Sequence, residues 1–458
     1  MKKFFSTIQN IWKIDELRNR ILFTLGLLFI YRVGSFIVLP GVVPAVLDNS
    51  ASSGGGNDLL GLINIFTGGA FNKGAIFALG IMPYITASII IQLLGFAVPY
   101  FKKLQSKEGE SGRKRLTQIT RLLTIAITLV QGGAYLTYLD QQGAVDPYVG
   151  SGLFYFAGLI ILSAGTIFAM WLGEKITDRG IGNGVSLLIT VGIIASLPLA
   201  FVAEFTRRAN EGGFFVFAIE LAALFAVVMV TVLIVQGIRK IPVQYVQRMV
   251  GRGSTDIAAA AATDSIPIKV IAAGVMPIIF AQALMFLPST LAQGLGGEGG
   301  ALQGAEWLNS ITDPTSFWYN FIQFLLVVIF TYVYTALIVD PQQYSEYLKS
   351  RNGFIPGVKP GKPTADFIDT VTTRITLPGS VALGLIAILP GIASSLLGID
   401  FGFALFFGGT SLLIMVAVVL DTLQQIESYL LMRRYDGLVK SGRVQGKQST
   451  MQQIGSTI

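Results

Sequence analysis

Residues 214–238 read FFVFAIELAALFAVVMVTVLIVQGI and contain one charged side chain, Glu220. A helix rises about 1.5 Å per residue, so this stretch is long enough to cross a hydrocarbon core about 30 Å thick. The whole chain has this character, because 52% of its 458 residues are apolar and 13% are charged, about half the charged share of soluble proteins. The sequence therefore predicts a membrane-embedded protein.

Stretches of similar hydropathy lie on both sides of this one and give ten predicted spans in all. They are residues 21–39, 75–98, 117–138, 152–172, 184–203, 214–238, 270–292, 317–339, 375–397 and 403–426. Residues 1–20 are amphipathic and no small-residue cleavage site follows, which is typical of an uncleaved signal anchor. The predicted fold class is an all-α polytopic membrane protein with ten transmembrane helices.

The basic residues divide unequally between the two sides of these spans. Of the 33 lysines and arginines, 29 lie in or beside the N-terminal segment, the tail and the connections on one side. Lys73, Arg207 and Arg208 lie on the other side, and Arg32 lies within the first span. Because cytoplasmic loops carry the excess of Lys and Arg, both termini are predicted to be cytoplasmic.

The chain contains neither cysteine nor histidine, which excludes thiolate and imidazole chemistry, disulfides and Cys/His zinc sites. The segment GVKPGKPT (residues 357–364) lacks the spacing of a nucleotide-binding P-loop. Arg32, Glu220 and Asp421 lie within spans, and none is paired with another by sequence spacing, so we interpret them as snorkelling or helix-packing groups. We expect no catalytic residue, no metal and no cofactor, which disfavours a membrane enzyme. A secondary transporter is the rival function, but it would need a coupling-ion site at mid-membrane.

One apolar segment is too short to be a span. Residues 59–67, LLGLINIFT, would cover about 14 Å as a helix, and Gly68, Gly69 and Gly74 separate them from the next span. Two readings remain open: a half-helix that folds back into a protein cavity, or a helix that lies flat on the outer surface.

Two short repeats relate the halves of the chain. GIMPYI (residues 80–85) matches GVMPII (residues 274–279), and SLLI recurs at residues 186–189 and 411–414. Each pair lies five spans apart, and five is odd, so the pattern predicts two halves of opposite orientation in the membrane. The connection at residues 204–213 would be a hinge between them.

Several polar groups lie inside spans. They are Gln92, Gln131, Gln282 and the GNG step at residues 182–184. Amides in spans commonly hydrogen-bond a neighbouring helix, and glycine allows close packing, although a substrate-facing role is the alternative.

Longer strings carry a specific resemblance. FALGIMPYITASIIIQLL (residues 77–94), KEGESGRKR (residues 107–115) and WLGEKITDRGIGNG (residues 171–184) resemble the SecY family of bacterial protein-translocation channels. The resemblance continues through RVGSF (residues 32–36), AGVMPIIFA (residues 273–281) and FFGGTSLLI (residues 406–414). It therefore extends from the first span to Arg434.

This resemblance implies an hourglass pore between two inverted five-helix halves, closed by a short plug half-helix and a ring of branched aliphatic residues. The implied plug residues are Leu59, Leu60, Leu62, Ile63, Ile65 and Phe66. The implied pore-ring residues are Ile81, Ile85, Val185, Ile189, Ile279 and Ile414. Spans two and three would face spans seven and eight across a lateral gate, with Gln92 and Gln131 as its polar residues. The implied function is a non-enzymatic channel that passes unfolded secretory polypeptides and their signal sequences, and releases membrane segments into the bilayer.

Partners and location also follow from the resemblance. Cytoplasmic arms at residues 239–268 and 341–374 would dock the ribosome and the motor ATPase SecA, and small SecE and SecG-type membrane subunits would join the channel. The expected docking residues are Arg239, Lys240, Arg248, Arg252 and Lys359. Lys359 replaces the arginine usual in the family and loses its planar fork, and the first arm has an alanine-rich tip, IAAAAATDS (residues 257–265). Whether the basic loops bind phosphates or are merely topogenic stays open.

These inferences give a domain plan in the bacterial cytoplasmic membrane. The parts are a cytoplasmic N-terminal segment, an N-terminal half, an external hinge, a C-terminal half and a cytoplasmic tail, at residues 1–20, 21–203, 204–213, 214–426 and 427–458.

Overall fold

The computed structural model describes residues 12, 14–44, 46–47, 59–106, 109–210, 213–245, 263–282, 284–285, 313, 316–399, 401–406 and 408–440. Its helices are α2 (Asp15–Gly34), α4 (Leu59–Phe66), α5 (Met82–Ala97), α6 (Pro99–Ser106), α7 (Gly109–Gln141), α8 (Ser151–Arg179), α9 (Gly184–Asn210), α10 (Phe214–Gln236), α13 (Phe317–Ile338), α14 (Pro341–Ser350), α15 (Lys362–Leu397), α16 (Phe401–Ala404) and α17 (Gly409–Lys440). Its strands are β1 (Ile238–Tyr245), β2 (Thr263–Lys269) and β3 (Gly353–Phe354).

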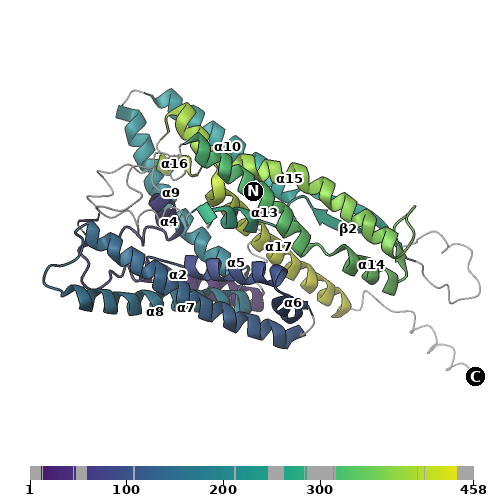
Figure 1. Ribbon diagram of the computed structural model, residues 1–458. Coiled ribbons are helices and arrows are strands. Elements are labelled where there is room, and N and C mark those ends of the chain that lie inside the picture. Colours follow the sequence, from purple (N-terminus) through teal and green to yellow (C-terminus); the bar gives the residue numbers. More distant parts are fainter. Residues whose placement is uncertain are drawn as a thin grey trace, which may run out of the picture.

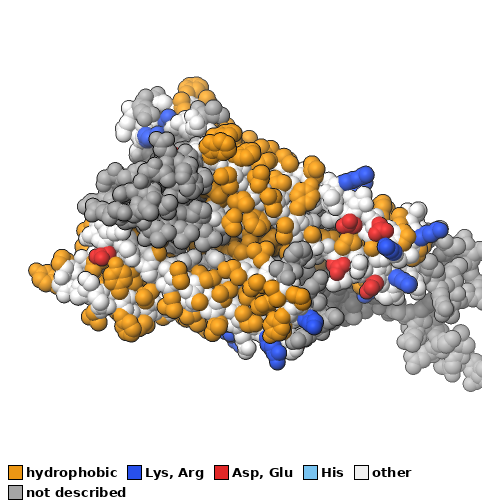
Figure 2. All heavy atoms as spheres, viewed as in Figure 1, with side chains coloured by type: hydrophobic (Ala, Val, Ile, Leu, Met, Phe, Trp, Pro, Cys, Tyr) orange, Lys and Arg blue, Asp and Glu red, His pale blue; other side chains and the backbone are white. Residues whose placement is uncertain are grey.

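Seven of the described helices are long and apolar enough to cross a membrane, namely α7, α8, α9, α10, α13, α15 and α17. In α10 polar side chains are buried and apolar ones are exposed, the reverse of a helix in a soluble protein. Glu220 and Thr231 are buried, whereas Phe215 and Leu233 are 85% and 66% exposed. Apolar side chains cover the visible face along both groups of helices, and charged side chains concentrate at one end (Figure 2). This arrangement suits a surface in contact with lipid.

The helices form two groups that face each other (Figure 1). In the first half of the chain α5 packs on α7 and α7 on α8, and in the second half α13 packs on α15. Helix α9 packs on α8 and also on α10, α16 and α17, so it joins the two groups. The short helix α4 packs on α9 between them.

A small sheet lies at the end of the second group, which we call the sheet end (Figure 1). The strand order is β2-β1-β3, with Arg239 opposite Ile268 and Gln244 opposite Phe354 in antiparallel register. Side chains from the sheet, α14 and the start of α15 share a core, namely Ile241, Val243, Ile268, Leu348, Ile355 and Ile368. The described parts of the two predicted arms therefore form one structural unit.

Several helices begin away from the predicted span boundaries. The second span was expected from residue 75, but turns occupy the stretch before α5 begins at Met82, because Gly74 and Gly80 have positive φ angles of 61° and 52°. Helix α2 begins at Asp15, inside the expected N-terminal segment. The KEGESGRKR segment was expected to be a connection, yet α7 begins at Gly109, where Glu110 and Lys114 form an i,i+4 ion pair. The expected seventh span is described only in part, with helix at residues 276–282.

The two sequence repeats have matching local structure. Gly80 and Gly274 both adopt positive φ, at 52° and 63°, and in each case a helix begins two residues later. Ser186 and Ser411 each lie two residues after the glycine that begins α9 or α17. The two members of each repeat therefore lie at equivalent helix starts, one in each half of the chain.

Candidate channel between the two halves

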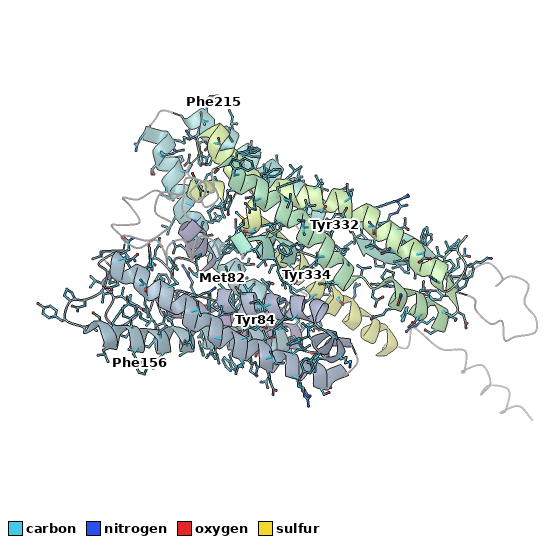
Figure 3. All side chains as sticks on the ribbon, in the orientation of Figure 1. Met82, Tyr84, Phe156, Phe215, Tyr332 and Tyr334 are labelled. Atoms are coloured by element: carbon cyan, nitrogen blue, oxygen red, sulfur yellow. The ribbon has the colours of Figure 1, made fainter. Side chains whose placement is uncertain are left out.

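The six expected pore-ring residues lie in one apolar cluster, although they come from separate segments. Ile81 precedes α5 and Ile85 lies on it, Val185 and Ile189 lie on α9, Ile279 follows Gly274, and Ile414 lies on α17. Four of them are buried in the cluster, and Val185 and Ile279 are partly buried against it. Met82, which adjoins Ile81 and also packs against the cluster, lies between the two groups of helices (Figure 3).

Helix α4, the expected plug, reaches the same cluster. Ile65 and Phe66 belong to it, and Ile63 belongs to a neighbouring cluster with Phe71 and Leu79. The side chains of Leu59, Leu60 and Leu62 lie outside the described part of the structure. Burial of α4 between protein helices favours the half-helix in a cavity over a helix lying flat on the surface.

The end of α4 contacts two helices of the first half. The Nη1 atom of Arg32 on α2 donates a 2.6 Å hydrogen bond to the carbonyl of Gly68. Gly68 has a φ of +65°, and a side chain there would collide with both Arg32 and the backbone of Gly192 on α9. Arg32 was expected to snorkel or pack, and the structure gives it this specific backbone partner instead.

Gln92 makes a contact between the halves. Its Oε1 atom accepts a 2.6 Å hydrogen bond from the hydroxyl of Tyr334 on α13, and its Nε2 atom donates to Ser88 at 3.1 Å. Gln131, the other expected gate residue, is half-buried on α7, which packs mainly on α5, α6 and α8. The structure therefore brings Gln92 to α13 and leaves Gln131 within the first half.

The GNG step also connects the halves. The amide of Gly182 donates a 2.8 Å hydrogen bond to Oε1 of Gln425 on α17, and the amide of Gly184 donates to Thr177 at 2.9 Å. A side chain at Gly184 would collide with the carbonyl of Gly173. These contacts favour the packing reading of this step over a substrate-facing one.

A buried charge network lies at the expected hinge, and it was not predicted from the sequence. Arg207 and Arg208, at the end of α9, donate to Glu204 and Glu220 respectively, both at 2.6 Å. Both glutamate side chains are 0% exposed. The two arginines also donate to the backbone at the end of α15, including 2.6 Å from Arg207 to the carbonyl of Gly398. The available signal was the i,i+3 and i,i+4 spacing of Glu204 to the two arginines, with a further acidic residue, Glu220, inside the next span.

Near the sheet end the charges are exposed. Asp421, expected to snorkel or to pack between helices, lies 3.8 Å from Nζ of Lys269, and the two side chains are 65% and 47% exposed. Arg239, Lys240 and Lys359, three of the expected docking residues, are exposed. The other two, Arg248 and Arg252, lie outside the described residues.

Comparison with known proteins agrees with this geometry. The SecY family model matches residues 75–423. Protein translocase subunit SecY of Mycobacterium bovis is 40% identical over 457 residues, covering 96% of this chain and all of that protein. Protein translocase subunit SecY of Chlamydia trachomatis is 37% identical over 465 residues, with the same coverage of both chains.

Solved structures show the same fold at lower identity. A protein-conducting channel aligns with a TM-score of 0.63 and 18% identity, covering 89% of this chain and 91% of that one. A SecY structure, described as one whose plug domain stabilises the closed channel and maintains a membrane seal, aligns with a TM-score of 0.64, 19% identity and the same coverage of both chains. Sec61 from a canine ribosome-channel complex aligns with a TM-score of 0.60 and 17% identity, again covering 89% and 91%. The all-α polytopic membrane fold predicted from the sequence is confirmed, and the chain belongs to the SecY family.

Proposed function

We propose that this chain is the channel-forming subunit of a protein translocase, and that it conducts unfolded polypeptides without catalysing a reaction. The observation that carries the proposal is the meeting of six aliphatic side chains, from both halves of the chain, with the helix α4 in one apolar cluster. The SecY relatives and the protein-conducting channels of the same fold support it.

The chemistry of the cluster suits this function. A narrow collar of isoleucine and valine excludes water, so it resists hydrated ions when no polypeptide is present. The collar carries no charge that would hold a passing chain, and its side chains can repack around cargo of different size. Helix α4 is the plug of this proposal: its Ile65 and Phe66 pack in the same cluster as the collar, and it would provide a second barrier.

A lateral route into the membrane would open where α5 faces α13. The hydrogen bond between Gln92 and Tyr334 supports this position, because it joins helices of opposite halves. Signal sequences and apolar membrane segments would leave the channel there and enter the lipid. Gln131 on α7 would contribute to the same gate only after α7 moves with α5.

The proposed orientation places both termini and the sheet end in the cytoplasm, in the cytoplasmic membrane of a bacterium. The unequal distribution of basic residues supports it. The exposed residues Arg239, Lys240 and Lys359 would then dock the ribosome or the motor ATPase SecA. Ribosome complexes among structures of the same fold support the first partner. Small SecE and SecG-type subunits would pack on the outer surface of the helices.

Conductance measurements test the seal. Replacing Ile85, Ile189, Ile279 and Ile414 together with Asn introduces amides that hold water at the constriction, so resting ion current through planar bilayers should rise. Replacing Phe225, Leu233 and Phe215 with Ala changes exposed residues of α10 but keeps that face apolar, and should leave the current unchanged. Equal resting currents in the ring variant and the wild type would contradict a pore at this cluster.

A further inference from the structure

The segment that follows α4 is fastened to it by internal hydrogen bonds. The hydroxyl of Thr67 donates to the carbonyl of Ile63 at 3.0 Å and accepts from the amide of Phe71 at 3.2 Å. The Oδ1 atom of Asn64 accepts from the amide of Asn72 at 3.1 Å. Residues 63–72 therefore behave as one unit, which we call the α4 unit, and a force applied to the turn after α4 reaches the helix.

Two side chains of the first half hold this unit at different points. The hydroxyl of Tyr135 on α7 donates a 2.7 Å hydrogen bond to the carbonyl of Phe71, at the base of the unit. Arg32 on α2 donates to the carbonyl of Gly68, next to the end of the helix. A cation at this end of α4 also interacts favourably with the partial negative charge of a helix C-terminus.

The guanidinium of Arg32 is itself held in place. Its centre lies 4.9 Å from the centroid of the Phe36 ring, one turn further along the chain. The contact covers part of the planar group, so its N–H groups remain directed toward Gly68. Gly192 also fixes the position of this turn against α9, because its lack of a side chain allows the backbone of Phe66 and Gly68 to approach α9 closely.

We propose that Arg32 is the positioning residue that holds α4 in its closed position, and that separation of Arg32 from Gly68 accompanies displacement of α4. This inference rests on the proposed role of α4 as the plug. The bond of Tyr135 to Phe71 lies at the base, so the unit can pivot there once Arg32 has separated. Charge-assisted hydrogen bonds are stronger than neutral ones, which makes the Arg32 contact the main polar restraint on the helix itself.

The test uses the translocase in proteoliposomes, with Phe66→Cys as a reporter in this cysteine-free chain. Phe66 is buried in the central cluster, so a membrane-impermeant maleimide should label the cysteine slowly. Adding Arg32→Gln should raise the labelling rate at least about tenfold, the effect expected from losing a hydrogen bond to a charged group, and should raise resting conductance. Arg32→Lys keeps a charged donor and should give a smaller increase in both.

Two controls separate positioning from general damage. Arg20→Gln removes an arginine from the same helix that pairs with Glu16, and it should leave labelling at Phe66→Cys unchanged. Tyr135→Phe removes the bond at the base and should have less effect than Arg32→Gln. If Arg32→Gln does not assemble, Phe36→Leu, which removes the aromatic contact of the guanidinium, should still accelerate labelling.

Unchanged labelling and unchanged conductance in both Arg32→Gln and Phe36→Leu would overturn the proposal for Arg32. The ring variant of the preceding section is measured beside them. If the ring variant raises resting conductance but the Arg32 variants change neither conductance nor labelling, only the role of Arg32 is rejected. If the ring variant also leaves resting conductance unchanged, the channel assignment itself is rejected.

Discussion

The hydroxyl of Tyr334 donates a 2.6 Å hydrogen bond to Oε1 of Gln92, and these residues lie 242 positions apart on helices of opposite halves. Tyr334 also packs on Phe280, with ring centroids 4.5 Å apart. Figure 3 shows Tyr334 near α5 and Tyr332 farther from it on the same helix. One polar contact therefore joins α5 to α13 where the proposed lateral gate would open.

Tyr334→Phe should favour the open gate. The variant keeps the ring and loses a hydrogen bond of about 0.6 kcal/mol, the average for such bonds between membrane helices, so the opening equilibrium should shift roughly threefold. The rate of translocation of a substrate with a weakly apolar signal sequence should rise accordingly. Tyr332→Phe is the matched control, and equal rates in the two variants would argue against a role of the Tyr334 contact in gating.

The buried charges at the hinge should contribute strongly to stability. Glu220→Ala removes one of the two buried carboxylates that Arg208 contacts, while Glu204 remains 3.0 Å from Arg208. The free energy of unfolding should therefore fall by about 1.5–3 kcal/mol, the contribution of a hydrogen bond to a charged group. Glu174→Ala breaks the exposed pair with Arg121 and should cost less than about 1 kcal/mol. Thermal unfolding in detergent measures both. A loss of stability for Glu220→Ala no larger than for Glu174→Ala would contradict the buried network.

The proposed orientation predicts opposite labelling at two ends of the molecule. Ser350→Cys lies at the sheet end and should be cytoplasmic, whereas Tyr148→Cys, at a position 97% exposed between α7 and α8, should be external. An impermeant thiol reagent added to intact cells should modify the second cysteine only. Modification of Ser350→Cys from outside would reverse the topology.

The exposed basic residues of the sheet end should act in binding. Replacing Arg239, Lys240 and Lys359 with Ala should change the free energy of unfolding by less than about 0.5 kcal/mol per site, because these side chains are solvated. Affinity for ribosomes or for SecA should fall, most clearly at low salt. Changing three exposed acidic residues of the same region to Ala controls for surface alteration. If affinity for both partners were unchanged, the charges would be topogenic alone.

Hydropathy was sufficient to predict where most long helices lie, because spans such as α10 and α13 are apolar along their whole length. Hydropathy did not predict where α5 begins, because the positive φ angles of the preceding glycines, rather than hydropathy, make the chain turn there. The repeats predicted two halves of opposite orientation, and the equivalent helix starts that they mark became visible only in the structure. The ring, plug and gate assignments came from family resemblance.

Contacts between distant residues could not be predicted in the same way. Gly68 accepts from Arg32, and Gly398 accepts from Arg207, through backbone carbonyls that carry no residue-specific signal in the sequence. Glu220 was interpreted as a snorkelling or helix-packing group, whereas the structure buries it in an ion pair with Arg208. This partner is set by how α9 and α10 fold back on each other.

Photocrosslinking tests the central claim, that a polypeptide passes through the apolar cluster, most directly. Photoreactive residues are placed at Ile85 and Ile279, and at Phe225 on the exposed face of α10 as a control. A secretory chain stalled during translocation should crosslink at Ile85 and Ile279 and not at Phe225. A stalled chain that crosslinks at neither Ile85 nor Ile279 would contradict the assignment of this cluster as the translocation path.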